Sequence, residues 1–472
     1  MSESEYDVIV IGGGPVGENV ADRAVRGGLT AALIECDLFG GECSYWACIP
    51  SKALLRPGEA RRAAQHVRGA LAGDAAPNPA EVFARRNAVV NNWNDSGQID
   101  WAGRQGITAL RGIGRLAGER RVTVTDPEGL ETTLTARHAV VVSTGTRAAV
   151  PDIPGLRAAK PWTSREATSS QTAPDRLAVI GGGVVAVEMA TAYAGLGSAV
   201  TMVSLTPLLA NVEAFAGEAV LEGLQALGVE VITGDSPATV TRADDGVVTL
   251  ETKNGRTIVA DEVLAATGRA PSTADIGMET VGLEPGAWFA VDDTLRVDGF
   301  DWLYAVGDVN HRALLTHQGK YQARAAGEVI VARALGEEVD DAAWGRHVAT
   351  ADHAAVPQVI FTDPEVAAIG LSEAQARKAG TEITVVDFDL GSVAGAVLYQ
   401  DGYAGRARMI VDEGRGVIIG MTLVGPAVAE LLHAATTAVV GEVPIARLWH
   451  AVPSFPTISE VWLRLLEAYR DR

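Results

Sequence analysis

The sequence has few cysteines, no long apolar run and no excess of positive charge. Three cysteines among 472 residues are too few for a secreted disulfide framework and indicate a reducing compartment. No uninterrupted apolar run is long enough to span a bilayer. The net charge of −20 argues against nucleic acids and anionic membranes as partners. Because the acidic start Met1–Asp7 leads straight into an apolar stretch, it is not typical of a signal peptide. We therefore expect a cytoplasmic protein.

The length predicts several domains, and the first begins with a nucleotide-binding pattern. A chain of 472 residues is too long for one core. Asp7–Ile11 reads as a buried strand, and Gly12-Gly13-Gly14-Pro15-Val16-Gly17 then matches G-x-G-x-x-G opening a helix. Gly12 makes the tight turn, Gly14 lets a pyrophosphate approach, and Gly17 lets the helix pack on the strand. The next strand, Ala31–Ile34, is followed by Glu35, an acid suited to a ribose 2′-hydroxyl. This order predicts a dinucleotide site.

A second copy of the pattern lies in the middle of the chain. Leu177–Ile180 precedes a G-x-G-x-x-A sequence with Gly181, Gly183 and Ala186 at its key positions. Two fingerprints imply two dinucleotides, and hydride chemistry pairs a nicotinamide with a flavin. The following strand ends in Ser204, where an NAD site commonly has an acid, and no arginine follows closely to bind a 2′-phosphate. We weigh NADPH slightly above NADH, and the choice stays open.

Two cysteines lie five positions apart in Gly40-Gly41-Glu42-Cys43-Ser44-Tyr45-Trp46-Ala47-Cys48-Ile49-Pro50-Ser51-Lys52. In a regular helix this spacing separates the Cα atoms by about 8–9 Å, whereas a disulfide needs about 4.4–6.8 Å. A bridge between Cys43 and Cys48 therefore requires an irregular turn, which Pro50 and the two glycines permit. From the spacing alone, two unrelated buried thiols are an equal alternative.

This stretch resembles the redox-active motif of the class I pyridine nucleotide-disulfide oxidoreductases. These are the flavoproteins of the dihydrolipoamide dehydrogenase, glutathione reductase and mercuric reductase family, whose pattern is approximately GGTCLNVGCIPSK. The chain keeps both glycines, both cysteines and the Ile-Pro-Ser-Lys end, but has Ser-Tyr-Trp-Ala in the middle. Two later segments also resemble family signatures, and the resemblance extends over nearly the whole chain. They are the crossover around Gly268, which has Ser272 in place of the usual Asn, and the flavin signature ending in Gly307-Asp308. A buried strand also ends in Thr144-Gly145, whose small residues let the strand end abut a cofactor.

The resemblance implies FAD and NAD(P)H as cofactors and assigns roles to residues. It makes Cys43 the thiol that exchanges with substrate and Cys48 the thiol nearer the flavin. It puts Lys52 near flavin N5 and pairs it with Glu188, because a cation there favours the anionic reduced flavin. The residues expected to bind the cofactors are Gly12, Gly14, Gly17, Glu35, Lys52, Thr144, Gly145, Gly181, Gly183, Ala186, Ser204, Gly268, Gly307 and Asp308.

The resemblance also implies a fold. We expect an α/β protein with two Rossmann-like domains, for FAD and NAD(P), and a C-terminal α+β dimerisation domain of the glutathione reductase type. The expected division is residues 1–150 and 271–343 for FAD, 151–270 for NAD(P), and 344–472 for the interface domain. Residues 56–90 are expected to be helical, and residues 112–135 to form a small antiparallel excursion. The family organisation implies a homodimer in which each subunit completes the other's active site.

The C-terminal signature departs from the family pattern H-P-T-x-S-E. The chain has Phe455 in place of the histidine that takes the thiol's proton, and retains Glu460, which orients that histidine in the family. Phenylalanine cannot accept a proton, so the thiol–disulfide step loses an effect of about 10²–10⁴ in rate. His450 is either a substitute base or a packed residue. The bulky Tyr45 and Trp46 are either core residues or an aromatic shelf for a flat acceptor such as a quinone.

We predict an FAD-dependent NAD(P)H oxidoreductase that resembles dihydrolipoamide dehydrogenase. Its electrons are expected to pass through FAD to the Cys43–Cys48 disulfide, then to a small disulfide-type acceptor, with Cys43, Cys48, Lys52, Glu188 and Glu460 as the catalytic set. One alternative is direct reduction of quinones, dyes or oxygen by FAD, with vestigial or regulatory cysteines. An alternative of another class is a non-catalytic flavin-binding redox sensor. No metal site is expected, and mercuric ion is an unfavoured substrate because no further cysteine pair lies near the chain's end.

Overall fold

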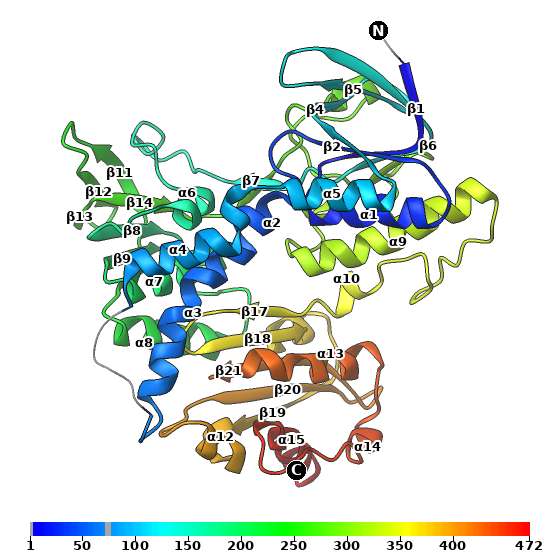
Figure 1. Cartoon of the computed structure of the whole chain (residues 1–472). Helices are drawn as coiled ribbons and strands as arrows, with labels where there is room; N and C mark the ends of the chain where they lie inside the picture. The colour runs from blue at the N-terminus through cyan, green and yellow to red at the C-terminus, as the bar shows by residue number, and fades with distance from the viewer. Residues whose placement is uncertain (1–2, 71–76) are drawn as a thin grey trace. The chain divides into compact units, whose positions relative to one another are not determined.

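The computed structural model describes residues 3–70 and 77–472 (Figure 1). The first two residues, and residues 71–76 within the stretch expected to be helical, lie outside the described range. The chain divides into two compact units, which we call unit 1 and unit 2. Unit 1 comprises Met1–Pro50, Asn87–Ala148 and Arg269–His353, and unit 2 comprises Ser51–Arg86, Ala149–Gly268 and Ala354–Arg472. The expected division into three domains stays a prediction.

Unit 1 is built on a seven-stranded mixed sheet. Its order is β3-β2-β1-β6-β5-β4, with β16 pairing on β6. The parallel strands are β1 (Glu3–Ile11), β2 (Ala31–Glu35), β3 (Thr108–Arg111), β6 (Glu131–Val142) and β16 (Leu303–Ala305). The antiparallel strands are β4 (Ile113–Leu116) and β5 (Arg121–Thr125), which confirms the expected antiparallel excursion. A separate ribbon joins β7 (Thr146–Ala148) to β15 (Arg269–Pro271).

Three helices cover the sheet of unit 1: α1 (Pro15–Arg26), α5 (Ser96–Gln105) and α9 (Thr316–Leu335). Figure 1 shows α1 and α9 running side by side against the sheet. The inner face of α1 buries Gly17, Val20, Ala21 and Ala24, and its outer face carries charged side chains. This apolar stripe packs with β1, β2 and α9 in one core, which holds the glycine turn at the end of β1 against the sheet.

Unit 2 contains a four-stranded parallel sheet of order β10-β9-β8-β14. Its strands are β8 (Arg176–Ile180), β9 (Ala199–Ser204), β10 (Glu230–Thr233) and β14 (Glu262–Ala265). Helices α6 (Ser164–Ser169), α7 (Val184–Gly195) and α8 (Ala214–Ala226) accompany them, together with an antiparallel sheet of β11 (Pro237–Arg242), β12 (Val248–Thr252) and β13 (Thr257–Ala260). Every residue of α7 from Ala186 to Tyr193 is buried, as its apolar sequence requires.

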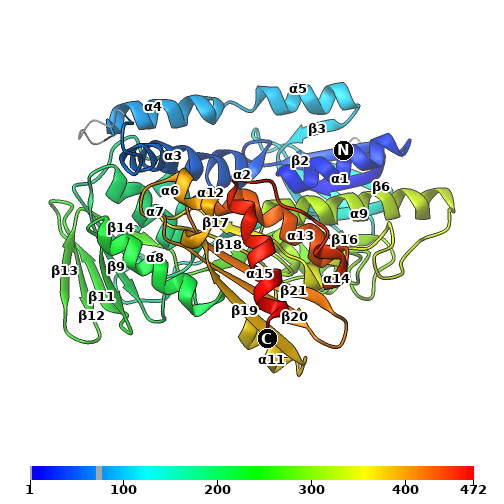
Figure 2. The ribbon, with the colours of Figure 1, turned by 90° about the horizontal axis from the view of Figure 1, so that it is seen from below.

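The rest of unit 2 is a five-stranded antiparallel sheet with helices (Figure 2). In sheet order its strands are β17 (Gln358–Ile360), β18 (Glu365–Gly370), β21 (Val417–Gly425), β20 (Arg406–Asp412) and β19 (Ile383–Asp389). Its helices are α11 (Glu373–Lys378), α12 (Ala394–Tyr399), α13 (Leu432–Val440), α14 (Ile445–Leu448) and α15 (Val461–Arg470). One apolar core joins residues of α7, α8, β18 and β21, so both sheets of unit 2 belong to one body.

Three helices cross the divisions between the units along the chain: α3 (Cys48–Gln65), α4 (Pro79–Val89) and α10 (Ala351–Ala354). The described parts of α3 and α4 agree with the helical expectation for residues 56–90. Across the described residues, no helix combines the length and the apolar character that a membrane span needs.

Candidate active site

The two redox-motif cysteines of unit 1 lie at a break between helices. Helix α2 (Gly41–Tyr45) carries Cys43 and ends at Trp46, and α3 begins at Cys48. Both Gly40 and Gly41 have positive φ angles, which starts the irregular turn predicted from the sequence. The break leaves Cys48 near Cys43, and hydrogen bonding to Cys48 together with burial raises the pKa of the Cys43 thiol. The structure carries the cysteines as thiols.

Helix α9 supplies a third group at this pair. The Thr316 hydroxyl, at the first residue of α9, lies 3.4 Å from the Cys48 sulfur. It also lowers the pKa of the Cys43 thiol, against the larger effect of Cys48. Sequence analysis assigned no role to Thr316, which lies 268 positions from Cys48 along the chain.

The aromatic residues inside the cysteine motif are core residues. Tyr45 is 1% exposed and Trp46 is 8% exposed, and their rings contact each other with centroids 5.7 Å apart. Both pack in a small cluster with Val90, Leu38 and Trp93. Because these rings face the interior, the packing interpretation is favoured over an exposed shelf for a flat acceptor.

The first glycine turn has the shape of a dinucleotide cradle. A Cβ on Gly12, where φ is +108°, would lie 2.4 Å from the Ser143 carbonyl oxygen, and one on Gly17 would lie 2.0 Å from that of Gly12. A Cβ on Gly14 would meet only the Gly41 Cα, at 3.9 Å, so its backbone is open to a close approach. Glu35, at the end of β2, accepts a 2.8 Å hydrogen bond from the Gly13 amide, and burial raises the pKa of its carboxyl.

Asp308 belongs to a polar chain that reaches back to the cysteine helix. The Thr146 hydroxyl donates to the Asp308 carboxylate at 2.6 Å. Arg269 donates to the Thr146 hydroxyl and carbonyl, and forms a 2.7 Å ion pair with Glu42, the residue before Cys43. The family pattern has Thr where this chain has Glu42. Sequence reasoning missed this pairing, because Glu42 and Arg269 are 227 positions apart.

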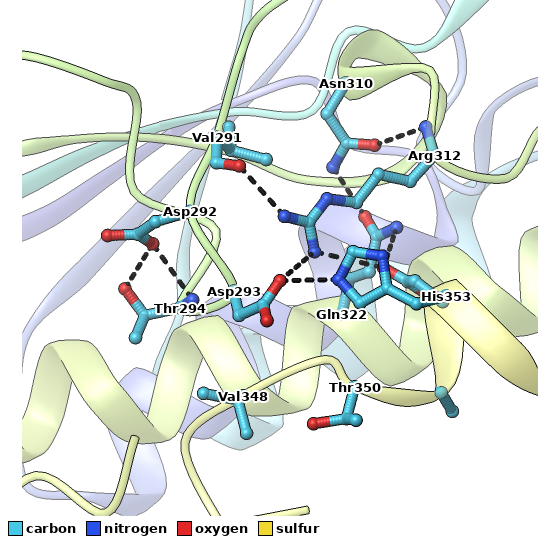
Figure 3. A network of polar contacts seen from close by, with 12 residues as sticks. Val291, Asp292, Asp293, Thr294, Asn310, Arg312, Gln322, Val348, Thr350 and His353 are labelled. Atoms are coloured by element: carbon cyan, nitrogen blue, oxygen red, sulfur yellow. Dashed lines mark hydrogen bonds and ion pairs between the residues drawn. The ribbon is translucent and has the colours of Figure 1, made fainter. Parts of the chain in front are cut away.

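A second network supports the turn that carries Asp308, and Figure 3 shows two of its members, Asn310 and Gln322. The Gln322 side-chain oxygen accepts hydrogen bonds from the Gly307 amide, at 2.7 Å, and the Asn310 side chain, at 2.8 Å. Its amide nitrogen donates to the buried Asp352 at 2.9 Å. The pKa of the Asp308 carboxyl is raised mainly by burial. Next to this turn, the Thr144 hydroxyl is buried and makes no hydrogen bond to any described residue. This orphaned donor fits a site built for a polar ligand.

Unit 2 brings Lys52 and Glu188 together. The Lys52 ammonium donates to one Glu188 oxygen at 2.7 Å, and the Phe361 amide donates to the other at 3.1 Å. Glu188 is 3% exposed, and the Lys52 ammonium also lies 4.9 Å from the centre of the Phe361 ring. Both carboxylate oxygens therefore have partners, as a buried charge requires. The predicted pairing of Lys52 with Glu188 agrees with this contact, and its role at a flavin stays a prediction.

The second glycine turn has the same backbone pattern as the first, but the strand that follows it ends in Ser204, where the strand after the first turn ends in Glu35. A Cβ on Gly181, where φ is +128°, would lie 2.2 Å from the Ala266 carbonyl oxygen, whereas a Cβ on Gly183 would meet nothing within 4 Å. Ala186 is fully buried where the pattern places its small residue. Ser204 ends β9 but is 2% exposed and donates its hydroxyl to the Thr206 carbonyl at 2.7 Å. Its side chain is therefore already engaged within its own loop.

Comparisons with known proteins agree with this geometry. Residues 6–328 match the family model described as pyridine nucleotide-disulphide oxidoreductase, and residues 356–465 match the dimerisation domain of the same family. The chain belongs to the pyridine nucleotide-disulphide oxidoreductases.

Relatives match along nearly the full length of this oxidoreductase. It is 31% identical to the dihydrolipoyl dehydrogenase of Haloferax volcanii, over 98% of this chain and 95% of that protein. It is 32% identical to the mercuric reductase of Shigella flexneri, over 98% of this chain and 80% of that protein. Among solved structures, a Cu(II) complex of the HOCl-induced flavoprotein disulfide reductase RclA from Escherichia coli has a TM-score of 0.84 at 24% identity, covering 98% of this chain and 99% of that one. The LpdA structure from Mycobacterium tuberculosis has a TM-score of 0.82 at 24% identity, with the same coverage.

The family membership confirms the fold class and the cofactor class. The oxidoreductase is an α/β enzyme of the glutathione reductase type, with FAD-binding, NAD-binding and dimerisation domains. It uses FAD and NAD(P)H. The cradle at Gly14 and the orphaned Thr144 hydroxyl fit FAD in unit 1, and the open backbone at Gly183 fits a pyridine nucleotide in unit 2.

The oxidoreductase keeps the C-terminal signature except at Phe455. Phe455 is 76% exposed. One Glu460 oxygen accepts a 2.6 Å hydrogen bond from Arg464, and the other is buried without a hydrogen-bond partner among the described residues. His450 is exposed beyond the end of α14, which disfavours its interpretation as a packed residue. The neighbouring Trp449 ring lies 5.0 Å from the Arg470 guanidinium.

Proposed function

We propose that this oxidoreductase passes electrons from NAD(P)H through FAD to the Cys43–Cys48 pair and from there to a small disulfide. The placement of Cys43 and Cys48 on either side of the break between α2 and α3, where Cys48 is the main influence on the pKa of the Cys43 thiol, carries the proposal, because thiol–disulfide chemistry within one chain needs the two sulfurs close together. Thr316, next to Cys48, supports it, since a hydroxyl donor stabilises a thiolate there.

The cysteines exchange with substrate in two balanced steps. When bound, FAD supplies hydride acceptance from NAD(P)H and a two-electron reduction of the disulfide. The Cys43 thiolate then attacks one sulfur of the substrate disulfide, which forms a mixed disulfide and releases the first substrate thiolate. The Cys48 thiolate attacks the Cys43 sulfur, which restores the Cys43–Cys48 disulfide and releases the second. Each released thiolate takes a proton from solution.

Other side chains hold the charges and the cofactors in place. Lys52 provides a cation for the reduced flavin, and Glu188, with both oxygens engaged, fixes the position of its ammonium group. In unit 1, Gly14 would admit the FAD pyrophosphate at a turn shaped by Gly12 and Gly17, Glu35 would hold the ribose, and Thr144, Gly145, Gly307 and Asp308 would hold the remainder of the cofactor. In unit 2, Gly181, Gly183, Ala186, Ser204 and Gly268 would form the NAD(P)H site.

The dimerisation domain supports a homodimer as the working form. In such a dimer, the family resemblance puts Phe455 at the position of the histidine base that would serve the other subunit's cysteines; Phe455 is exposed, and Glu460 keeps one oxygen without a partner among the described residues. Thiol–disulfide exchange is then slow for ordinary disulfides, and a substrate with a good leaving thiol is favoured.

Direct transfer from the flavin to a quinone or dye is a second candidate function. The observation that favours it is Phe455, an exposed aromatic side chain at the position of the missing base. Such a ring stacks on a flat acceptor and does no proton chemistry.

An anaerobic NADPH titration of the FAD-loaded enzyme tests the two candidates. If the cysteines take electrons from the flavin, uptake is about four electrons per FAD, two for the flavin and two for the disulfide. Cys48→Ser then lowers uptake to about two and abolishes the long-wavelength absorbance of a thiolate beside the flavin. Cys36→Ser is the matched control, because Cys36 lies outside the motif and leaves both readings unchanged. Uptake of about two electrons in the unmodified enzyme contradicts the disulfide route and favours the direct one.

A further inference from the structure

Helix α2, which carries Cys43, is too short to hold its own position. It has five residues, Gly41–Tyr45, and an isolated helix shorter than about 12–15 residues is marginal in water. The position of the Cys43 sulfur is therefore set by the contacts that α2 makes with the rest of unit 1. Two of these contacts lie on either side of Cys43 along the chain, and they differ in kind.

The contact that follows Cys43 is mainly apolar. The rings of Tyr45 and Trp46 pack with Val90 in the small core cluster described above. The Trp93 side-chain nitrogen also donates a 3.2 Å hydrogen bond to the Tyr45 carbonyl. This end of α2 is therefore held by packing and by one hydrogen bond to its backbone.

The contact that precedes Cys43 is ionic and joins residues 227 positions apart. Arg269, the first residue of β15, donates to the Glu42 carboxylate at 2.7 Å. The same guanidinium donates through Nε to the Thr146 hydroxyl and through Nη2 to the Thr146 carbonyl, the latter at 2.7 Å. One planar guanidinium thus ties α2 to the ribbon of β7 and β15, and a guanidinium is the cationic group suited to several fixed contacts at once.

This end of the ribbon is itself held by the turn that carries Asp308. The Thr146 hydroxyl donates to the Asp308 carboxylate at 2.6 Å, and the Arg269 Nε lies 3.9 Å from the same carboxylate oxygen. Gln322 in turn accepts a 2.7 Å hydrogen bond from the Gly307 amide of that turn. The guanidinium of Arg269 is therefore fixed on its far side, and it provides a stationary attachment for α2.

We propose that Glu42 and Arg269 are positioning residues that hold Cys43 within reach of Cys48 and so set how readily the Cys43–Cys48 disulfide forms. The S–S bond forms as the two thiols pass two electrons and two protons to an oxidised partner, such as a disulfide that breaks in exchange. The equilibrium depends on the effective concentration of one sulfur at the other, which falls when α2 is free to move. Both side chains act through the position of α2 rather than through contact with a sulfur.

This geometry makes the length of the side chain at position 42 more important than its charge. Glu42→Gln removes the charge but keeps the length and an acceptor oxygen for Arg269. Glu42→Asp keeps the charge but withdraws the carboxylate by one methylene group, which breaks the 2.7 Å contact. A charge that acted on the sulfurs from a distance would give the opposite order of effects.

The test measures the equilibrium between the dithiol and the disulfide directly. A Cys36→Ser background leaves only the two motif cysteines. The FAD-loaded enzyme is equilibrated without oxygen in reduced and oxidised dithiothreitol at a series of ratios, and the remaining thiols are alkylated and counted by mass spectrometry. We expect Glu42→Ala to lower the equilibrium constant for disulfide formation about tenfold, equivalent to about 30 mV. Glu42→Asp is expected to lower it nearly as much, and Glu42→Gln to retain most of the unmodified value.

Variants of the arginine test the other half of the ion pair. Arg269→Lys keeps the charge, but a single ammonium group cannot reproduce the contacts of a guanidinium with both Thr146 and Glu42, so we expect a shift like that of Glu42→Ala. Asp275→Asn is the matched control, because it breaks another arginine–carboxylate pair of unit 1, in which Arg115 contacts Asp275 at 2.6 Å. This control is expected to leave the equilibrium unchanged.

The inference rests on the proposed role of the cysteine pair, but the two can fail separately. An equilibrium constant that is unchanged or raised in either E42A or R269K overturns the inference, as does an equal shift in D275N. A shift in E42Q as large as that in E42D also overturns it, because charge and not position then acts. If E42A or R269K does not fold, the comparison of E42D with E42Q decides. Failure of the NADPH titration with these shifts intact overturns only the proposed function, and a pair that forms no disulfide at any ratio overturns both.

Discussion

Two buried glutamates of unit 2 differ in how their oxygens are used. Glu188 has both carboxylate oxygens engaged, one by the Lys52 ammonium at 2.7 Å and one by the Phe361 amide at 3.1 Å. Glu460 has one oxygen on Arg464 and one that is buried without a described partner. An unmade hydrogen bond of a buried acceptor costs about 1–3 kcal/mol. A single chain shows such an unpartnered oxygen where its partner has been lost, or where the partner is supplied from outside that chain.

In the function proposed above, Glu188 belongs to the electron-entry side of the enzyme and Glu460 to its exit side. The groups proposed to serve the cofactors form a complete set of contacts around Glu188. The groups proposed to serve the substrate thiol do not, because Glu460 keeps one oxygen without a described partner and Phe455 stands at the position predicted for the base. We infer that the chain retains family chemistry toward NAD(P)H and FAD and has changed it toward the acceptor.

The largest effect is expected from removing the Lys52 cation, which pairs with Glu188 on the electron-entry side. We expect Lys52→Met to slow reduction of the bound flavin by NADPH about 10²-fold, because a fixed positive charge at the reduced flavin is lost and Glu188 is left unpaired. Stopped-flow absorbance measures this rate. Lys52→Arg keeps the charge and is expected to retain most of it. An unchanged rate in K52M shows that the Lys52–Glu188 pair is structural only.

The second prediction concerns the exit side, where a histidine at position 455 would supply the base that Phe455 cannot. Phe455→His is expected to raise turnover with lipoamide or another small disulfide about 10–10²-fold, since an imidazole at this position takes up the thiol's proton. The gain is expected to depend on pH between about 5 and 8, where histidine titrates. Steady-state rates with NADPH and lipoamide across this range measure it.

The unpartnered oxygen of Glu460 provides the control for this gain. If that oxygen orients the new imidazole, Phe455→His combined with Glu460→Gln loses most of the gain, while Glu460→Gln alone changes little. Phe455→Ala removes the ring without adding a base and is expected to give no increase. Equal turnover in F455H and F455A means that access to the cysteines, and not proton transfer, limits the exchange.

Motifs that are local in sequence predicted local backbone geometry. The two glycine turns, the strand ends at Glu35 and Ser204 and the break between Cys43 and Cys48 depend on residues a few positions apart, whose steric needs are visible in the sequence. The Lys52–Glu188 contact was reached only through the family resemblance, because nothing local joins residues 136 positions apart.

Tertiary pairings account for what the sequence did not reveal. The Glu42–Arg269 ion pair depends on β15 pairing with β7, and the raised pKa of Glu18 depends on burial between packed helices. The motif letters of Tyr45 and Trp46 are equally compatible with exposure and burial, so only the packing of α2 decides between them. The aromatic identity of a residue does not by itself determine whether its side chain is buried or exposed.

Glu18 in unit 1 is a third carboxyl to compare, and like Glu460 it has one oxygen without a partner among the described residues. Its folded-state pKa of about 7 lies above the usual value of 4.5, so its contribution to stability is present below pH 4.5 and is lost as the pH rises through 7. A neutral amide does not titrate. Relative to the unmodified enzyme, Glu18→Gln is therefore expected to gain up to about 3 kcal/mol between pH 4.5 and pH 8.5. Unfolding temperatures at several pH values measure this trend, with Asp22→Asn as control; a difference that does not vary with pH contradicts it.

The smallest expected effect concerns the coenzyme itself, at the end of β9. Leu205 is 69% exposed and directly follows Ser204, whose hydroxyl is committed to Thr206, so neither residue offers charge to the ribose. We expect Leu205→Arg to raise the ratio of kcat/KM for NADPH over NADH about 5–10-fold, because an arginine there attracts a 2′-phosphate. Leu205→Glu is expected to shift the ratio the other way by repelling it. Steady-state rates with saturating acceptor give both ratios. A shift in the same direction for both variants means that the shape of the loop, and not its charge, governs the preference between NADPH and NADH. The coenzyme side would then differ more from the family than the intact Glu188 contacts indicate.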